Sequence, residues 1–100
     1  MKKLSDYEIE QRLDEITGWK FENQKIMKEW TFNSFASAFG FMSSIAILAD
    51  SMNHHPEWFN FKNKVKVWLT THEVGGVSEN DVLLASKINA LDDAGQAIKK

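Results

Sequence analysis

The chain has 100 residues, of which 43% are hydrophobic, and a formal net charge of −2. This length predicts a single domain spanning residues 1–100, with room for one hydrophobic core. The slight acidic excess argues against direct binding to nucleic acid, which requires a clear basic surface. The chain has no cysteine, which excludes disulfides, thiolate zinc sites and thiol catalysis and fits a reducing compartment.

No segment of the sequence is expected to enter a membrane or to direct export. The most apolar stretch, from Phe35 to Ala49, is interrupted by serines and a glycine and is shorter than a bilayer-spanning helix. The N-terminal residues are charged where a signal peptide would be apolar. We therefore expect a soluble protein of the cytoplasm.

The first half of the chain predicts a helix, two strands and a second helix. Ser5 and Glu8 form a capping-box pattern ahead of apolar residues at helical spacing, and Gly18 is a natural stop. Alternating residues over 19–22 and 25–32 predict two strands joined by a turn. The second helix is expected to be broken by residues 53–56, because a residue that precedes proline disfavours the helical conformation. Its apolar stripe comprises Phe35, Ala38, Phe39, Met42, Ile45, Ala46, Ala49 and Met52.

The second half predicts two further strands, over 58–61 and 64–71, and a last helix. In the second of these strands aliphatic residues alternate with lysine and tryptophan, and continued alternation places His72 on the Lys/Trp face. Ser78 and Asp81 form another capping-box pattern, which is a sufficient explanation for this aspartate. The apolar stripe of the last helix is Leu84, Ile88, Leu91 and Ile98.

The order of elements, α-β-β-α-β-β-α, predicts the fold class. A strand–strand–helix succession that occurs twice is typical of one four-stranded antiparallel sheet, here with three helices packed on a single face. The expected class is α+β.

Three histidines in two short segments are the main candidates for chemistry: His54-His55-Pro56 and Thr71-His72-Glu73. Imidazole exchanges protons near neutral pH, since its ordinary pKa is about 6.5. Neighbouring side chains of an extended segment point to opposite faces, so His54 and His55 are expected to differ in role. Asp50, about one helical turn before His54, is a candidate to orient an imidazole. A solvated carboxylate at a helix end explains Asp50 equally well.

The two segments resemble the signature of the pterin-4a-carbinolamine dehydratases, also called 4a-hydroxytetrahydrobiopterin dehydratases. That signature has a charged residue four positions before His-His-Pro, then an aromatic residue, a later histidine and an aspartate beyond it. The resemblance extends upstream to Ile26-x-Lys28-x-Trp30-x-Phe32 and so covers nearly the whole chain. One position departs, because Lys62 stands where the family usually has tyrosine or tryptophan.

The resemblance implies a lyase that removes water from a 4a-hydroxytetrahydropterin and yields the quinonoid dihydropterin, within tetrahydropterin recycling. It also implies no metal or organic cofactor, a homodimer or homotetramer, and a functional link to an aromatic amino acid hydroxylase. We expect His54, His55 and His72 to be catalytic, with the acid, base and positioning roles left open. Substrate contacts are expected from Asp50, His54, His55, Pro56, Trp58, Thr71, His72, Glu73 and Val74; for Trp58, core packing is the alternative.

Two other functions fit parts of the sequence. One is a non-catalytic interaction module that binds a protein partner through the small-residue helix or the sheet, as implied by a relative in animals that is a dimerisation cofactor for a homeodomain transcription factor. The other is a metal site built from the three histidines, since imidazole favours zinc or copper. Adjacent histidines rarely ligate one ion together, which argues against the metal site.

Overall fold

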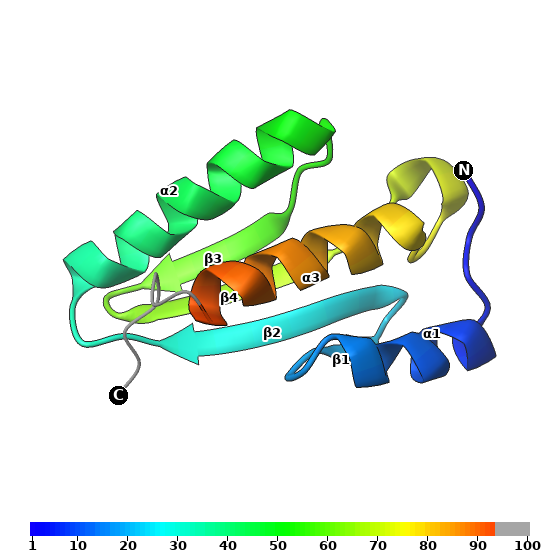
Figure 1. The fold of residues 1–100 in the computed structure, drawn as a ribbon, viewed down its shortest axis with the longest axis horizontal. Coiled ribbons are helices and arrows are strands. Elements are labelled where there is room, and N and C mark those ends of the chain that lie inside the picture. Colours follow the sequence, from blue (N-terminus) through cyan, green and yellow to red (C-terminus); the bar gives the residue numbers. More distant parts are fainter. Residues whose placement is uncertain (94–100) are drawn as a thin grey trace.

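The structure is a computed structural model that describes residues 1–93. Its elements are α1 (Asp6–Arg12), η1 (Leu13–Glu15), β1 (Lys20–Glu22), β2 (Lys25–Thr31), α2 (Phe35–Met52), β3 (Glu57–Phe61), β4 (Lys64–Leu69), η2 (His72–Val74) and α3 (Glu79–Asp93), where η marks a short 3-10 helix. The strands form one antiparallel sheet in the order β1-β2-β4-β3, with α2 and α3 across one face (Figure 1). The predicted α+β class and order of elements are confirmed.

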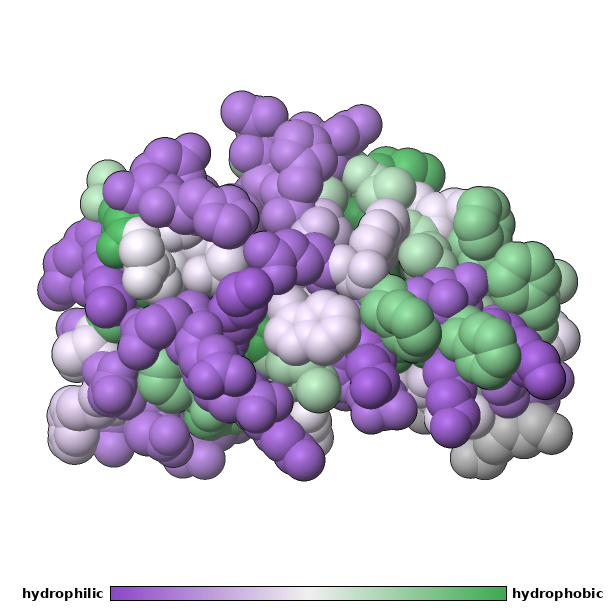
Figure 2. Space-filling model, turned by 180° about the vertical axis from the view of Figure 1, so that it is seen from behind, coloured by the Kyte–Doolittle hydropathy of each residue, from purple (hydrophilic) through white to green (hydrophobic). Residues whose placement is uncertain are grey.

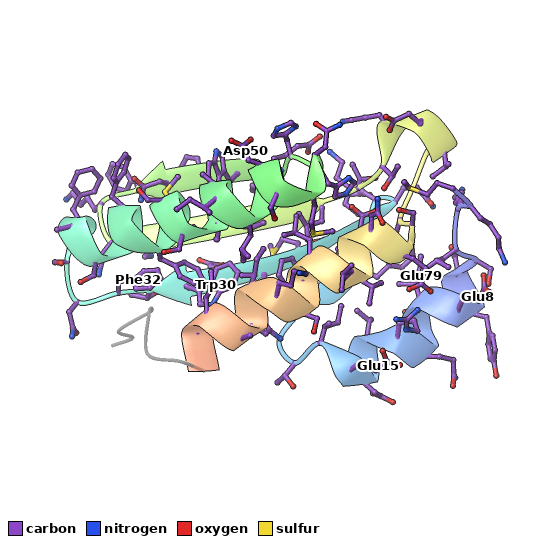
Figure 3. All side chains as sticks on the ribbon, turned by 45° about the horizontal axis from the view of Figure 1, so that its top comes forward. Glu8, Glu15, Trp30, Phe32, Asp50 and Glu79 are labelled. Carbon is purple, nitrogen blue, oxygen red and sulfur yellow. The ribbon has the colours of Figure 1, made fainter. Side chains whose placement is uncertain are left out.

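The core lies between the sheet and the helices and is built around aromatic side chains. Trp30 of β2 packs edge-on against Phe41 of α2, with ring centroids 5.0 Å apart, and against Trp19 at 5.9 Å. Figure 3 shows Trp30 and Phe32 in this layer. Buried aromatic pairs in edge-to-face contact add to the stabilisation that comes from area burial alone. This cluster therefore fixes how the helices sit on the sheet.

The first helix begins as the sequence predicts. The Ser5 side chain accepts a hydrogen bond from the Glu8 amide, and the Glu8 carboxylate accepts one from the Ser5 amide, so the capping box is complete. The hydrogen bond from the Ser5 backbone is the main cause that lowers the pKa of Glu8. The Leu4 amide donates to Val77 at 2.8 Å, which ties the N-terminal segment to the start of α3.

The buried face of α2 differs from the expected stripe. Phe35 and Phe39, placed on that stripe, are 58% and 56% exposed, whereas Phe41 is fully buried. The reason is that the Phe41 ring inserts between Phe32 and Trp30, with ring centroids at 5.2 and 5.0 Å, and this sets the rotation of the helix. The residues that α2 buries are Ala38, Phe41, Ile45 and Ala49.

α2 covers Phe35–Met52, the full extent of the expected apolar stripe, and its 18 residues are long and apolar enough to cross a membrane by length and composition alone. This differs from the expectation that the stretch is too short and too polar. In the structure the helix lies on the sheet and buries part of its surface in the core, which is the arrangement of a helix in a globular domain.

β4 confirms the predicted alternation but ends earlier than expected. Val65, Val67 and Leu69 are fully buried on its core face. The strand stops at Leu69, and the chain then forms an isolated bridge between Thr71 and Gly76 around η2. Ile98, expected on the stripe of the last helix, lies outside the described residues.

Candidate functional site

The end of α2 sets the position of the histidine pair. The Asn53 amide donates to the Asp50 carbonyl at 3.1 Å, and the His54 amide donates to the Ala49 carbonyl at 3.0 Å. These two bonds form a Schellman motif, in which the residue after the helix adopts the left-handed conformation. Asn53 does so, with φ 50°. The helix therefore ends through this turn, before the region restricted by Pro56, and the chain leaves it with His54 facing α3.

A buried carboxylate holds His54. Asp81, in the first turn of α3, is fully buried, and its Oδ1 lies 2.5 Å from Nε2 of His54. Its Oδ2 accepts hydrogen bonds from the Ser78 amide at 2.8 Å and from the Thr71 hydroxyl at 2.7 Å. A carboxylate only accepts hydrogen bonds, so the network assigns an imidazole hydrogen to Nε2 of His54.

The hydroxyl groups around Asp81 have defined directions. Because Thr71 donates its one hydroxyl hydrogen to Asp81, the Ser78 hydroxyl donates to Thr71 at 2.7 Å. Thr71 and Ser78 are both buried. The Asp81 carboxylate thus joins three segments, the loop after α2, the loop after β4 and the start of α3, at one point.

His55 points away from this buried network. Its side chain is largely exposed, and its Nε2 lies 3.4 Å from Oδ1 of the exposed Asp50. The expectation that His54 and His55 face different surroundings is therefore met in the structure. The carboxylate beside His55 is that of Asp50, and the carboxylate beside His54 is that of Asp81. In Figure 3 the labelled Asp50 lies on the outer side of α2.

His72 belongs to η2 and contacts a third carboxylate, that of Glu57. Its side chain is 80% exposed, and its Nε2 lies 3.5 Å from Oε2 of Glu57. The other carboxylate oxygen of Glu57 accepts a hydrogen bond from Lys25 Nζ at 2.6 Å. Glu57 pairs with Trp68 across the strands, so His72 contacts the Lys/Trp face that the sequence predicts, although it belongs to η2 and not to the strand.

The three histidines line one cavity of about 160 Å³, and no two of them share a carboxylate. The cavity is lined by Asn53, His54, His55, Thr70, His72 and Glu73. Within the described chain, no group of three or more His, Asp or Glu side chains is arranged to hold a metal ion. The arrangement brings three groups that can exchange protons near neutral pH to the lining of one small cavity.

Several expected contact residues lie beside the cavity and do not line it. Thr71 is connected to the site only through its hydrogen bond to Asp81. Pro56 and Val74 are half-buried and lie next to lining residues in the sequence. Trp58 lies on the core face of the edge strand, opposite Val67, and is 37% exposed. It is therefore not part of the fully buried core.

The departing residue Lys62 lies in the turn between β3 and β4, with φ 54°. Its ammonium group is 5.4 Å from the ring centroid of Phe61. It is not among the residues that line the histidine cavity. Its substitution for the family aromatic therefore leaves the walls of that cavity intact.

Sequence reasoning missed three residues at the site. Asp81 has a capping role, as expected, but its contact with His54 was not foreseen. Asn53 and Thr70, which line the cavity, were not singled out either. For Asn53 a signal exists, because asparagine directly after an apolar helix favours a left-handed cap.

Comparisons with known proteins identify the family of this chain. Residues 2–91 match the model of the family described as pterin 4 alpha carbinolamine dehydratase. A relative from Solibacter usitatus is 47% identical over 89% of this chain and 94% of its own length, and one from Sulfurisphaera tokodaii is 44% identical over 91% and 98%. Both carry the name "Putative pterin-4-alpha-carbinolamine dehydratase".

Solved structures with the same fold are also known. A Brucella melitensis protein described as a transcriptional coactivator/pterin dehydratase superposes with a TM-score of 0.86 and is 40% identical, covering 89% of this chain and 97% of its own. A pterin dehydratase-like protein described as a RuBisCO assembly factor shares the fold at a TM-score of 0.59 and 23% identity, over 73% of this chain and 84% of its own. On the family match and these relatives together, the chain belongs to the pterin 4 alpha carbinolamine dehydratase family.

Proposed function

We propose that this protein is a 4a-hydroxytetrahydrobiopterin dehydratase that works by histidine acid/base catalysis in tetrahydropterin recycling. The observation that carries the proposal is the meeting of His54, His55 and His72 around one cavity, with His54 oriented by the buried Asp81. A base held in one tautomer by a carboxylate is a recurring arrangement for proton transfer. Family membership supplies the substrate class.

The reaction requires one proton to be delivered and one to be removed. The C4a–O bond breaks as the leaving hydroxyl is protonated to water, and the N5 proton passes to a base as the C4a–N5 double bond forms. We assign these two transfers to His54 and His72, which line the same cavity and contact different carboxylates, and substrate positioning to His55. Each positioned proton transfer is typically worth about 10²–10⁴ in rate.

Of the other expected contact residues, Glu73 lines the cavity and is proposed to contact the substrate directly. Asp50, Pro56, Trp58, Thr71 and Val74 do not line it, and we propose that they act indirectly, by supporting the three histidines. Glu73 lines the cavity and is exposed, so its backbone and carboxylate are placed to meet a polar edge of the substrate. The proposal places the protein in the cytoplasm as a homo-oligomer, linked to an aromatic amino acid hydroxylase. It requires neither a metal nor an organic cofactor.

The test follows the disappearance of freshly generated 4a-hydroxytetrahydrobiopterin by stopped flow, with and without the protein. The wild type should accelerate dehydration, and His72→Ala should reduce the catalysed rate about 10²-fold. Its thermal unfolding should stay unchanged, because the side chain is 80% exposed. Lys62→Ala, outside the cavity, is the control and should keep the wild-type rate. A folded wild type that gives no acceleration would contradict the proposal.

A second candidate function, a protein-interaction module, is favoured by one observation. Phe35 and Phe39 form an exposed aromatic pair on α2, with ring centroids 6.1 Å apart. Exposed aromatic clusters mark interaction sites, and the Brucella melitensis relative is described as a transcriptional coactivator as well as a dehydratase. A folded, inactive wild type that binds a partner, and loses it on Phe39→Glu, would favour this function over catalysis.

A further inference from the structure

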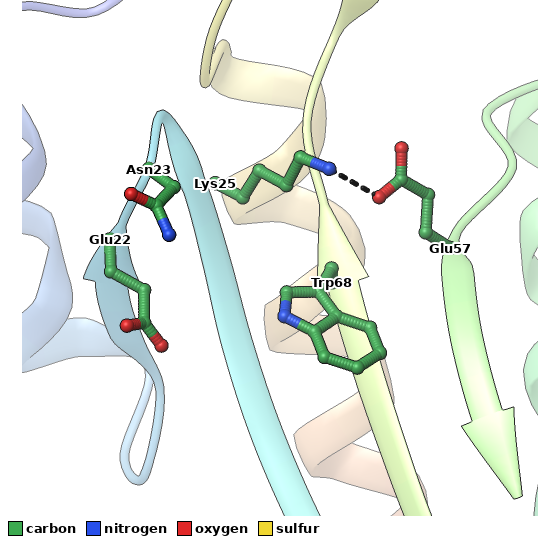
Figure 4. A pocket seen from close by; sticks show the side chains of 5 residues that line it. All are labelled: Glu22, Asn23, Lys25, Glu57 and Trp68. Atoms are coloured by element: carbon green, nitrogen blue, oxygen red, sulfur yellow. Dashed lines mark hydrogen bonds and ion pairs between the residues drawn. The ribbon is translucent and has the colours of Figure 1, made fainter.

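A second cavity lies beside the histidine cavity, over the face of the sheet that the helices leave open. It has a volume of about 320 Å³ and is lined by Glu22, Asn23, Lys25, Glu57 and Trp68. Figure 4 shows Glu22 and Asn23 on one side, Glu57 on the other, and the Trp68 indole between them. The proposed acid/base chemistry uses none of these five side chains directly.

The two cavities are linked by a contact between a lining residue of each. Glu57 lines the second cavity, and its Oε2 lies 3.5 Å from Nε2 of His72, which lines the first. Thr70, also a lining residue of the first, donates a hydrogen bond to the Gln24 carbonyl at 3.0 Å, and Gln24 sits between Asn23 and Lys25. A ligand in the histidine cavity therefore has the second cavity next to it, across the pair of Glu57 and His72.

The histidine cavity by itself is smaller than most sites for small molecules. Sites for small molecules usually enclose about 300–1,000 Å³, and the histidine cavity has only about 160 Å³. A ring bound against the histidines would fill that space, so any substituent on the ring must extend beyond it. The adjoining cavity supplies the missing room.

The walls of the second cavity are held in place. Asn23 and Gln24 both have positive φ, 53° and 63°, and connect β1 to β2 as a two-residue hairpin turn of the kind that matches strand twist. Lys25 and Glu57 are joined by a 2.6 Å hydrogen bond that links β2 to β3 above Trp68. Such a site is formed before the ligand arrives, which lowers the entropic cost of binding.

The chemistry of the walls defines the ligand. Glu22 and Glu57 carry negative charge against one lysine, so an anionic group is disfavoured, while carboxylate oxygens and the Asn23 amide suit hydroxyl groups. The Trp68 indole offers an apolar surface for short carbon chains. We propose that this cavity binds the substituent of the pterin ring and selects a short, neutral, hydroxylated chain. The inference rests on the proposed function for the location of the ring.

The test compares two stable probes, 7,8-dihydrobiopterin, which carries a dihydroxypropyl chain, and 6-methyl-7,8-dihydropterin, which carries a methyl group. Binding is measured by isothermal titration calorimetry for the wild type, Glu22→Ala and Asn23→Gly. The glycine tolerates the positive φ of the turn, so that variant removes the amide and keeps the hairpin. The control is Glu29→Ala, an exposed carboxylate further along β2 on the same face as Lys25.

The wild type should bind the dihydroxypropyl probe more tightly than the methyl probe. Each variant should weaken only the former, by about three- to tenfold, the value of one or two hydrogen bonds. The control should change neither. Equal affinity of the wild type for both probes, or equal loss of both in the variants, would overturn the inference.

Catalysed dehydration, measured on the same proteins, separates the two proposals. Acceleration without discrimination between the probes would overturn the substituent cavity and leave the dehydratase proposal standing. Discrimination without acceleration would support the cavity and overturn the dehydratase. Binding of neither probe by the folded wild type would overturn both.

Discussion

The position of His54 in the cavity depends on Asp81, because the two carboxylate oxygens of Asp81 form contacts with three segments of the chain. Oδ2 accepts from Ser78 and Thr71, and Oδ1 contacts His54. A buried carboxylate is costly unless its lone pairs are satisfied, so these contacts hold one another in place. Its position in the first turn of α3 is also favourable, since the helix dipole stabilises negative charge there.

Asp81→Asn tests this role at the scale of one residue. The amide keeps the volume, and its oxygen can still accept from Ser78 and Thr71. Its NH2 group then faces Nε2 of His54, so the hydrogen that the carboxylate holds on Nε2 loses its acceptor. We expect the catalysed dehydration rate to fall about 10²-fold and the free energy of unfolding to fall by about 1–3 kcal/mol. Stopped-flow kinetics and urea denaturation measure the two effects.

Asp50→Asn is the matched control, because Asp50 is exposed and accompanies His55. It should leave the free energy of unfolding unchanged. A fully active Asp81→Asn would show that the orientation of His54 has no part in the reaction.

The sequence predicts much of this site one residue at a time, but not its pairings. The alternation of an extended chain is enough to separate His54 from His55. Whether His54 contacts Asp50 or Asp81 depends on how α3 packs on the sheet. The distance of one helical turn between Asp50 and His54 in the sequence does not predict that packing. The capping-box pattern is a sufficient local explanation for Asp81, so the sequence offered no reason to expect its contact with His54, 27 positions away.

At the scale of elements, the end of α2 connects the core to the site. The Schellman motif at Asn53 makes the chain leave the helix at a fixed angle, and His54 is the next residue. A left-handed residue other than glycine costs free energy, and asparagine tolerates the conformation better than most. The helix end therefore sets the distance between His54 and α3.

Asn53→Ala and Asn53→Gly form a pair that isolates this effect, since both remove the side chain from the cavity. Alanine should lower the free energy of unfolding by about 1–2 kcal/mol, because its Cβ disfavours the left-handed conformation. Glycine should match or slightly exceed the wild type. Urea denaturation measures both variants. Equal stability of the alanine and glycine variants would show that the helix ends without this constraint.

Other elements show where periodicity is sufficient and where it is not. The strands and their core faces follow from alternation, and Val65, Val67 and Leu69 are buried as predicted. The rotation of α2 could not be read from its sequence, because apolar residues occur almost all round it. Contact of Phe41 with Trp30 and Phe32 decides it. The turn at η2 depends on the Thr71–Gly76 bridge, which local patterns do not encode.

At the scale of the whole molecule, the apolar surface left exposed is uneven. On the face opposite the helices, apolar side chains gather towards one end (Figure 2). The exposed aromatic residues include Phe59 and Phe61 of the edge strand β3 and the Phe35–Phe39 pair of α2. The histidine cavity lies at the other end of α2, where the helix terminates. The proposed catalytic site and the proposed association surface therefore lie at opposite ends of this helix.

Phe39→Glu tests the expected homo-oligomer. A domain of 100 residues buries a smaller share of its surface than a larger domain does, and exposed aromatic residues on α2 would be covered by a second copy. A charge at Phe39, which is 56% exposed, would be costly in such an interface and harmless in a monomer. Sedimentation velocity should show an oligomer for the wild type and a smaller species for the variant, with unchanged circular dichroism.

Tyr7→Glu, a 74% exposed aromatic on α1, is the control and should keep the wild-type assembly. Identical sedimentation of wild type and Phe39→Glu would place the association elsewhere or exclude it, whereas dissociation with retained dehydration would show that the histidine cavity is complete within one chain.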